Sequence, residues 1–234
     1  MKSRKPFVIV FIASFALLLT SCSDDSSSAN EPVDTFDAAV VCPADGMNAY
    51  GEPNRGTFTD ARDGQVYKYT TIGKQVWMAE NLRFDDGSWC AEDACSVKGR
   101  IYGMQNALVA CPTGWHLPSS DEWKELFNNV GSADSAGMRL KAAAGWTPMN
   151  PGQLSNGTDD CGFTLLPIPV SGIASNGLGG KKNDGYVALL WTSNRASTND
   201  YTMDGVVFET QALGARITTY YDEWDYLSIR CVRD

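Results

Sequence analysis

The chain has 234 residues with 19 basic and 28 acidic side chains, so its formal net charge at pH 7 is −9. A surface this acidic repels phosphate backbones and anionic lipid head groups, which argues against nucleic-acid binding and against electrostatic docking to membranes. The length is sufficient for one well-packed domain together with a tail.

Residues 1–21 have the pattern of a secretory signal peptide. A basic start is followed by an apolar run from Phe7 to Leu19, which is shorter than the ~20 residues that a membrane-spanning helix needs. The sequence LTSC at 19–22 resembles a bacterial lipobox. We therefore expect cleavage before Cys22 and lipidation of that residue, with palmitate among its acyl chains. The alternative is ordinary cleavage near a free or disulfide-bonded Cys22.

Residues 22–56 are expected to form a lipidated tether and an extended lead-in pinned by Cys42. Removal of residues 1–21 takes away three basic side chains and leaves 16 against 28 acidic ones, a net charge of −12. Membrane attachment would then depend on the lipid anchor only. The polar stretch SDDSSSAN at 23–30 has nothing to bury. It resembles the surface-export signals of bacterial lipoproteins, with a plain linker as the alternative, so we expect an outer membrane lipoprotein exposed at the cell surface.

The segment 57–82 has the apolar-polar alternation of β-strands. The turn sequences Asp63-Gly64 and Gly73-Lys74 interrupt it, which predicts a pair of β-hairpins. Later apolar runs are short and separated by residues rich in glycine, asparagine and proline. We interpret them as short strands joined by long loops: GFTLLPIPVSG at 162–172, YVALLWTSN at 186–194, YTMDGVVFE at 201–209 and YLSIRCVRD at 226–234.

Two helices are expected between these groups of strands. Ser119 and Glu122 have capping-box spacing, and Gly131 stands where a C-terminal cap belongs, which predicts a helix over 119–131. Its apolar face has the spacing i, i+3, i+4 and i+7. The residues of that face are Trp123, Leu126, Phe127 and Val130. A second, shorter helix is expected over 135–143.

Six of the seven cysteines remain once Cys22 is assigned to lipidation. Outside the cytoplasm an even number predicts three disulfides, whose connectivity the sequence leaves open. A structural zinc site is not expected, because the chain has no paired CxxC half-sites and only one histidine. The six residues are Cys42, Cys90, Cys95, Cys111, Cys161 and Cys231.

Seven motifs occur in a characteristic order along residues 57–234. They are DARDGQVYKYTTIGKQVWMAENL (60–82), GRIYGMQNA (99–107), CPTGWHLPSSDEW (111–123), AGMRLKAAAGW (136–146), GTDDCGF (157–163), LLWTSN (189–194) and SIRCVRD (228–234). Together they resemble the Fibrobacter succinogenes major paralogous domain family, a group of bacterial cell-surface lipoprotein domains. We therefore take residues 57–234 as one domain of this kind.

The resemblance implies a fold more than an activity. The family looks like a branch of the C-type-lectin-like fold, distantly related to the formylglycine-generating enzymes. This implies an α+β domain with two helices, small antiparallel sheets, long irregular loops and chain ends that lie close together. No biochemical activity is well established for the family.

The resemblance also implies a disulfide pairing. Cys161 stands where the family usually has an aromatic residue, and Cys42 lies outside the shared domain, so an additional bridge between these two is the economical explanation. Cys111 would then pair with Cys231, and Cys90 with Cys95. An oxidised Cys90–Cys95 pair would not supply the copper-binding thiolates of a formylglycine-generating enzyme.

His116 is the one histidine that could act as a catalytic base. It precedes the proline and the cap of the helix predicted over 119–131, at the place of the arginine in the RLPxxxEW-like motif of the related enzymes. We therefore expect a structural role in which its side chain hydrogen-bonds a neighbouring loop. No GxSxG nucleophile motif accompanies it.

Two patterns raise the question of calcium. The tripeptide Glu52-Pro53-Asn54 is also used by sugar-binding C-type lectins, but it lies in the lead-in here, so we interpret it as chance. Loop carboxylates elsewhere keep calcium possible, because calcium prefers hard oxygen ligands. The candidates are Asp159, Asp160, Asp184 and Asp204. No cofactor is otherwise expected.

The run TYYDEWDY at 219–226 is the candidate ligand surface. Aromatic faces could stack on sugar rings while carboxylates bind the hydroxyls. The alternative is that alternate residues pack in the core and the rest form a solvated turn. The candidate residues are Tyr220, Tyr221, Trp224, Tyr226, Asp222 and Asp225.

The sequence thus predicts a surface-exposed lipoprotein with a non-catalytic, lectin-like recognition domain. Its expected partner is an extracellular polysaccharide or another surface protein. A divergent enzyme, either a glycosidase-like hydrolase or an oxidase of the formylglycine-generating type, is one alternative. A purely structural envelope protein is the other.

Overall fold

The computed structural model describes residues 34–90, 95–168, 185–195, 201–221 and 225–234. Within these ranges the chain has an α+β fold with small antiparallel sheets and few helices, as expected. No helix there is both long and apolar enough to span a bilayer. The expected signal peptide, Cys22 and the polar stretch 23–30 lie outside the described residues.

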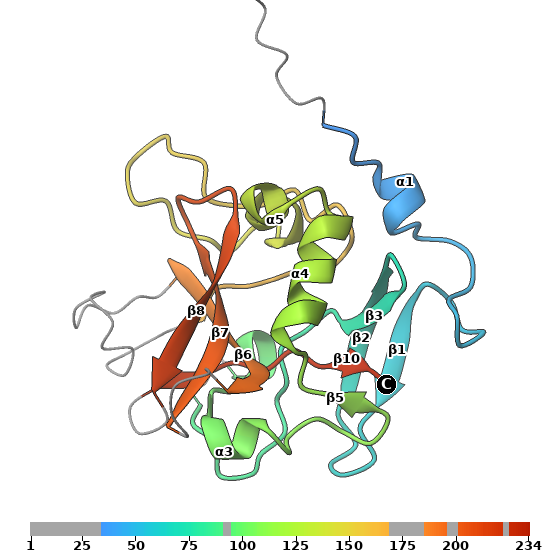
Figure 1. The fold of residues 1–234 in the computed structure, drawn as a ribbon, viewed down its shortest axis with the longest axis vertical. Coiled ribbons are helices and arrows are strands. Elements are labelled where there is room, and N and C mark those ends of the chain that lie inside the picture. Colours follow the sequence, from blue (N-terminus) through green and yellow to red (C-terminus); the bar gives the residue numbers. More distant parts are fainter. Residues whose placement is uncertain (1–33, 91–94, 169–184, 196–200, 222–224) are drawn as a thin grey trace, which may run out of the picture. The chain divides into compact units, whose positions relative to one another are not determined.

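The strands within the described ranges form three sheets, shown in Figure 1. The largest has the order β1-β2-β3-β10-β5, with β1 (Arg55–Thr59), β2 (Val66–Ile72), β3 (Gln75–Met78), β10 (Val232–Arg233) and β5 (Trp115–His116). A second pairs β4 (Tyr102–Gly103) with β9 (Tyr226–Leu227). The third contains β6 (Val187–Arg195), β7 (Thr202–Glu209) and β8 (Ala215–Tyr221).

The expected pair of hairpins is confirmed as the meander β1-β2-β3. Both turns contain a glycine with positive φ, +76° at Gly64 and +60° at Gly73, a conformation that glycine adopts without steric cost. Tyr67 and Tyr69 are buried on one face of β2, whereas Lys68 between them is exposed. The alternation therefore places the tyrosines in the core.

Helix α4 (Ser120–Asn129) lies between the first and third sheets (Figure 1). Ser119 and Glu122 form the expected capping box, and Gly131 follows the helix with φ +104°. Its apolar face packs against both sheets. The Trp123 ring centroid lies 4.7 Å from that of Trp77 on β3 and 6.3 Å from that of Phe208 on β7. One helix thus supplies core contacts to two sheets.

Helix α5 (Ala133–Leu140) begins and ends earlier than the expected 135–143. At its start, the Ser135 hydroxyl accepts a hydrogen bond from the N–H of Ser132 (3.1 Å) and caps the first turn. At its end, the chain becomes extended at Lys141, whose buried ammonium donates to the carbonyl oxygens of Glu209, Thr210 and Ala212. These tertiary contacts end the helix, and the local sequence does not show them. The remaining helices are single turns: α1 (Ala38–Val41), α2 (Cys95–Lys98) and α3 (Met104–Ala107).

Two other expectations are corrected. The described part of the expected strand 162–172 contains only an isolated bridge from Leu165 to Lys141, because Gly162 and Thr164 have positive φ and Pro167 has no N–H to donate. The lead-in is not extended throughout, since Asp37 caps the short helix α1.

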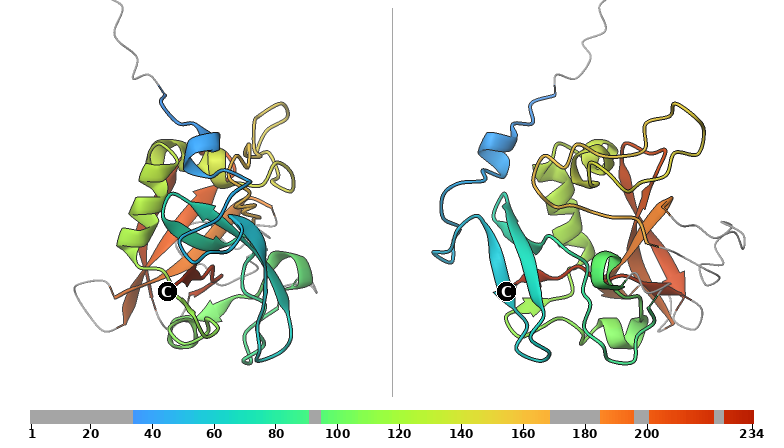
Figure 2. Two further views of the ribbon diagram at one scale, coloured as in Figure 1. Left: turned by 90° about the vertical axis from the view of Figure 1, so that its right-hand side faces the viewer. Right: turned by 180° about the vertical axis from the view of Figure 1, so that it is seen from behind.

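The lead-in contacts the C-terminal end of the chain. The Tyr50 hydroxyl donates to the backbone oxygen of Asp234 (2.6 Å), and Arg233 pairs with Glu52. Figure 2 shows the C-terminus beside the first strands of the chain. The lead-in therefore packs against the domain that it precedes.

Three disulfides link the described cysteines, in the pairing that the resemblance implied. Cys42 joins Cys161, Cys90 joins Cys95, and Cys111 joins Cys231. The first bridge fastens the lead-in to the segment 157–164, and the third fastens the chain before β5 to β10.

We predict that the two bridges Cys42–Cys161 and Cys90–Cys95 contribute unequally to stability. The paired cysteines are 119 residues apart in the first bridge and 5 apart in the second. Replacing both members of the long bridge by alanine should lower the free energy of unfolding by about 5 kcal/mol, against about 2 kcal/mol for the short one. Denaturant unfolding of the two double variants checks this, and an equal loss in both would contradict it.

Candidate functional site

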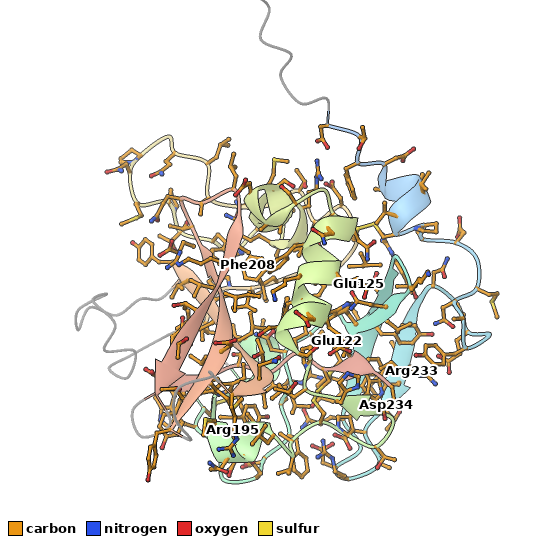
Figure 3. The ribbon with its side chains drawn as sticks, in the orientation of Figure 1. Glu122, Glu125, Arg195, Phe208, Arg233 and Asp234 are labelled. Atoms are coloured by element: carbon orange, nitrogen blue, oxygen red, sulfur yellow. A yellow bond between two sulfur atoms is a disulfide. The ribbon has the colours of Figure 1, made fainter. Side chains whose placement is uncertain are left out.

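His116 bridges two carboxylates. Its Nδ1 lies 2.7 Å from Asp234 Oδ1, and its Nε2 lies 2.8 Å from Glu122 Oε1. Figure 3 shows Glu122 at the start of α4 and Asp234 at the end of the chain. The structural role is the expected one, but the partners are the helix cap and the C-terminal residue, not a neighbouring loop.

Two of the three ionisable groups in this bridge, His116 and Glu122, stabilise each other's charged forms. Burial disfavours the imidazolium, but the hydrogen bonds to Glu122 and Asp234 outweigh it and raise the pKa of His116 above 6.5. Burial likewise opposes the Glu122 carboxylate, while hydrogen bonds from Ser119 and His116 hold its pKa below 4.5. The Glu122 carboxylate, in the first turn of α4, also interacts favourably with the positive end of the helix dipole.

The candidate ligand surface at 219–226 is corrected in part. Tyr220 and Asp225 are buried, with 4% and 0% of their surfaces exposed, so they belong to the core and not to a platform. Tyr226 is 37% exposed and lies opposite Gly103 of β4. Asp222, Trp224 and the side chain of Tyr221 lie outside the described residues.

The tripeptide Glu52-Pro53-Asn54 and two of the calcium candidates, Asp159 and Asp204, make contacts within the protein. Glu52 pairs with Arg233, and Asn54 Nδ2 donates to the Asp45 carbonyl (2.7 Å). Asp204 Oδ2 accepts from Ser120 Oγ (3.2 Å). In the described ranges no group of three or more His, Cys, Asp or Glu side chains could hold a metal ion; Asp184 falls outside them.

A cavity of about 250 Å³ lies among β2, the segment after β3, helix α2 and the segment at 164–166. The lining mixes charged, polar and apolar side chains, as small-molecule sites do. It consists of Lys68, Ala79, Glu80, Asn81, Ser96, Val97, Thr164, Leu166 and Arg230.

Arg230 is one of the lining residues and is 1% exposed. Asn81 Oδ1 accepts hydrogen bonds from its Nε (3.1 Å) and its Nη2 (2.9 Å), and its Nη1 donates to the Phe163 carbonyl. The guanidinium carbon lies 4.4 Å from the centroid of the Phe163 ring. Burial lowers the pKa of Arg230 to about 9, so the group stays charged at neutral pH.

Thr164, on the cavity wall, has a strained backbone. Its φ is +52°, a value that a β-branched residue rarely adopts. Asp159, itself at φ +53°, holds it there: Oδ1 accepts from the Thr164 N–H (2.7 Å) and Oδ2 from the Thr164 hydroxyl (2.8 Å). Strain of this kind costs about 1–3 kcal/mol and is concentrated at functional sites.

The sequence pattern alone did not indicate this site. Arg230 lies in the motif SIRCVRD, and Asp159 and Thr164 lie in and beside GTDDCGF, but these stretches are 67 residues apart at the Arg230–Phe163 contact. The available signal was a charged residue between Ile229 and Cys231 in an otherwise apolar run. Such a residue must find partners when it is buried.

We predict that the His116 bridge stabilises the fold over a defined pH window. The contribution of His116 should be complete below 6.5 and should be lost as the pH rises through its raised pKa. The contribution of Glu122 should be complete above 4.5 and should be lost as the pH falls through its lowered pKa.

The difference in unfolding free energy between the wild type and His116→Gln should therefore be largest between 4.5 and 6.5. It should stay below about 1 kcal/mol, because solvent screens the 41%-exposed imidazole. Denaturant titrations from acid to alkaline pH measure the difference. A difference that does not vary with pH would show that His116 acts by packing alone.

Comparison with known proteins places the chain in a family. The family model described as the Fibrobacter succinogenes major domain matches residues 70–233. No curated protein and no solved structure matches the chain. The matched region runs from β2 to β10 and includes α4, the segment 157–164 and Arg230. The chain therefore belongs to the Fibrobacter succinogenes major domain family.

Proposed function

We propose that this protein is a surface-exposed bacterial lipoprotein whose domain binds an extracellular ligand without catalysis, the ligand being a polysaccharide or another surface protein. The observation that carries the proposal is the cavity over Arg230. Its lining is fixed by contacts within the protein: Arg230 donates a buried hydrogen bond to Asn81, and Asp159 holds the strained residue Thr164. A site that is built before its ligand arrives loses less conformational entropy on binding.

The proposal includes a C-type-lectin-like fold. Its support is the helix α4 between two small sheets, the position of β10 inside the first sheet, and the contact between the lead-in and the C-terminus. Long loops on such a scaffold are positions where binding residues are presented.

Two contacts favour recognition over an oxidase and over a serine or cysteine hydrolase. Cys90 and Cys95 are joined as a disulfide, and a disulfide has no thiolate to offer copper. His116 is held between two carboxylates, so both of its ring nitrogens are hydrogen-bonded without a serine or cysteine that they could activate.

A glycan array with the purified full-length protein tests recognition. We expect selective binding to a subset of glycans and no turnover of chromogenic glycosides. Turnover of a glycoside without binding to any glycan would favour the hydrolase alternative. Binding to none with no turnover would remove the polysaccharide from the proposal and leave a surface protein, for which protease accessibility on intact cells is the prerequisite.

The lipid anchor is tested by Cys22→Ala. Because the acidic chain has no electrostatic means of membrane attachment, the variant should move from the membrane fraction to the soluble fraction. Ser21→Ala, which leaves the cysteine in place, is the control. Continued membrane association of Cys22→Ala would contradict the anchor.

A further inference from the structure

We propose that the cavity over Arg230 binds a carboxylate, and that its ligand is one uronic-acid unit of an acidic polysaccharide. This inference rests on the recognition function proposed above and specifies the chemistry of that site. Its starting point is a buried cation that the protein leaves without a directly paired anion.

Two of the five N–H groups of Arg230 have no acceptor among the described residues, although only 1% of the residue is exposed. A guanidinium has five N–H groups, and three of them are used, two by Asn81 and one by Phe163. Both acceptors are neutral oxygens. Among the described residues no carboxylate lies within ion-pair distance of this guanidinium. A buried charge without an ion pair is costly. A carboxylate that enters the cavity would supply the ion-pair partner that Arg230 lacks.

The two nearest acids are already engaged. Glu80 Oε2 accepts from the backbone N–H of Lys68 (2.7 Å), and its Oε1 pairs with Arg83 (3.3 Å). Both oxygens of Asp159 accept from Thr164. Lys68 adds a second positive charge at the cavity wall. The charged side chains of the lining are Lys68, Arg230 and Glu80, so the lining carries one net positive charge although the whole chain is acidic.

The size and the remaining lining fit one sugar ring. The volume of about 250 Å³ is below the range of drug-sized ligand pockets, about 300–1,000 Å³. Val97 and Leu166 offer apolar surface for the ring carbons, while Ser96 and Thr164 offer hydroxyl groups for its hydroxyls. The carboxylate on the ring would then hydrogen-bond the guanidinium, because the planar N–H donors of arginine match the two oxygens of a carboxylate.

The test compares uronic acids with their own methyl esters. Trimers of galacturonate, glucuronate and mannuronate, each as the free acid and as the methyl ester, are titrated into the full-length protein by calorimetry. At least one free acid should bind, and its methyl ester should bind at least tenfold more weakly, because the ester removes the charge and keeps the ring.

Matched variants locate the binding. Val97 is 66% exposed on the cavity wall and Val109 is 78% exposed elsewhere. Val97→Trp should fill the cavity and weaken acid binding at least tenfold, whereas Val109→Trp should leave it unchanged. Lys68→Gln should weaken it several-fold, and Lys74→Gln in the β2–β3 turn should not. Arg230→Gln should abolish the preference for acid over ester, provided that its circular dichroism shows a folded domain.

Each outcome decides. Acid-selective binding that Val97→Trp and Lys68→Gln weaken supports the inference. Equal binding of acid and ester that Val97→Trp weakens keeps the recognition function but overturns the carboxylate. Acid binding that neither variant affects overturns the assignment to this cavity. The absence of binding by all trimers overturns the inference, and the glycan array then decides separately whether the recognition function survives.

Discussion

The burial of Arg230 is the constraint on which the rest of this domain depends. One guanidinium holds Asn81, which follows β3, to Phe163, which follows the Cys42–Cys161 bridge. The residues that follow Arg230 make further contacts with distant segments: Cys231 is bonded to Cys111, and β10 lies between β3 and β5. A buried charge of this kind needs several hydrogen-bond partners. The first sheet, the Cys111–Cys231 bridge and the cavity therefore form only when the segment around Arg230 is in its native position.

Hydrogen bonds around Arg230 and Thr164 also fix the shape of the cavity. Asn81 fixes the guanidinium with one oxygen, and its own Nδ2 is held by the Lys98 carbonyl of α2 (3.0 Å). Elsewhere in the lining, Asp159 keeps Thr164 at a strained φ. Both parts of the lining are thus set by hydrogen bonds within the protein, which is the arrangement expected of a preorganised site.

Helix α4 provides the second organising element. Trp123 packs between rings from two different sheets, while the cap at Ser119 extends through Glu122 and His116 to Asp234. The helix start and the end of the chain are therefore one electrostatic unit. The single histidine of the sequence therefore connects the start of α4 to the end of the chain and does not line the cavity.

The sequence by itself determined the local structure of this protein. Turn glycines at 64 and 73, the Ser119 cap and the apolar face of α4 act over a few residues, so their patterns predict the hairpins and the helix. Membership of the family was likewise carried by ordered motifs. Only the tertiary structure decided where α5 ends, because Lys141 bonds carbonyls about 70 residues away. It also buried Tyr220 and Asp225 and brought Arg230 to Asn81 and Phe163, since contacts between distant segments depend on packing that no local pattern encodes.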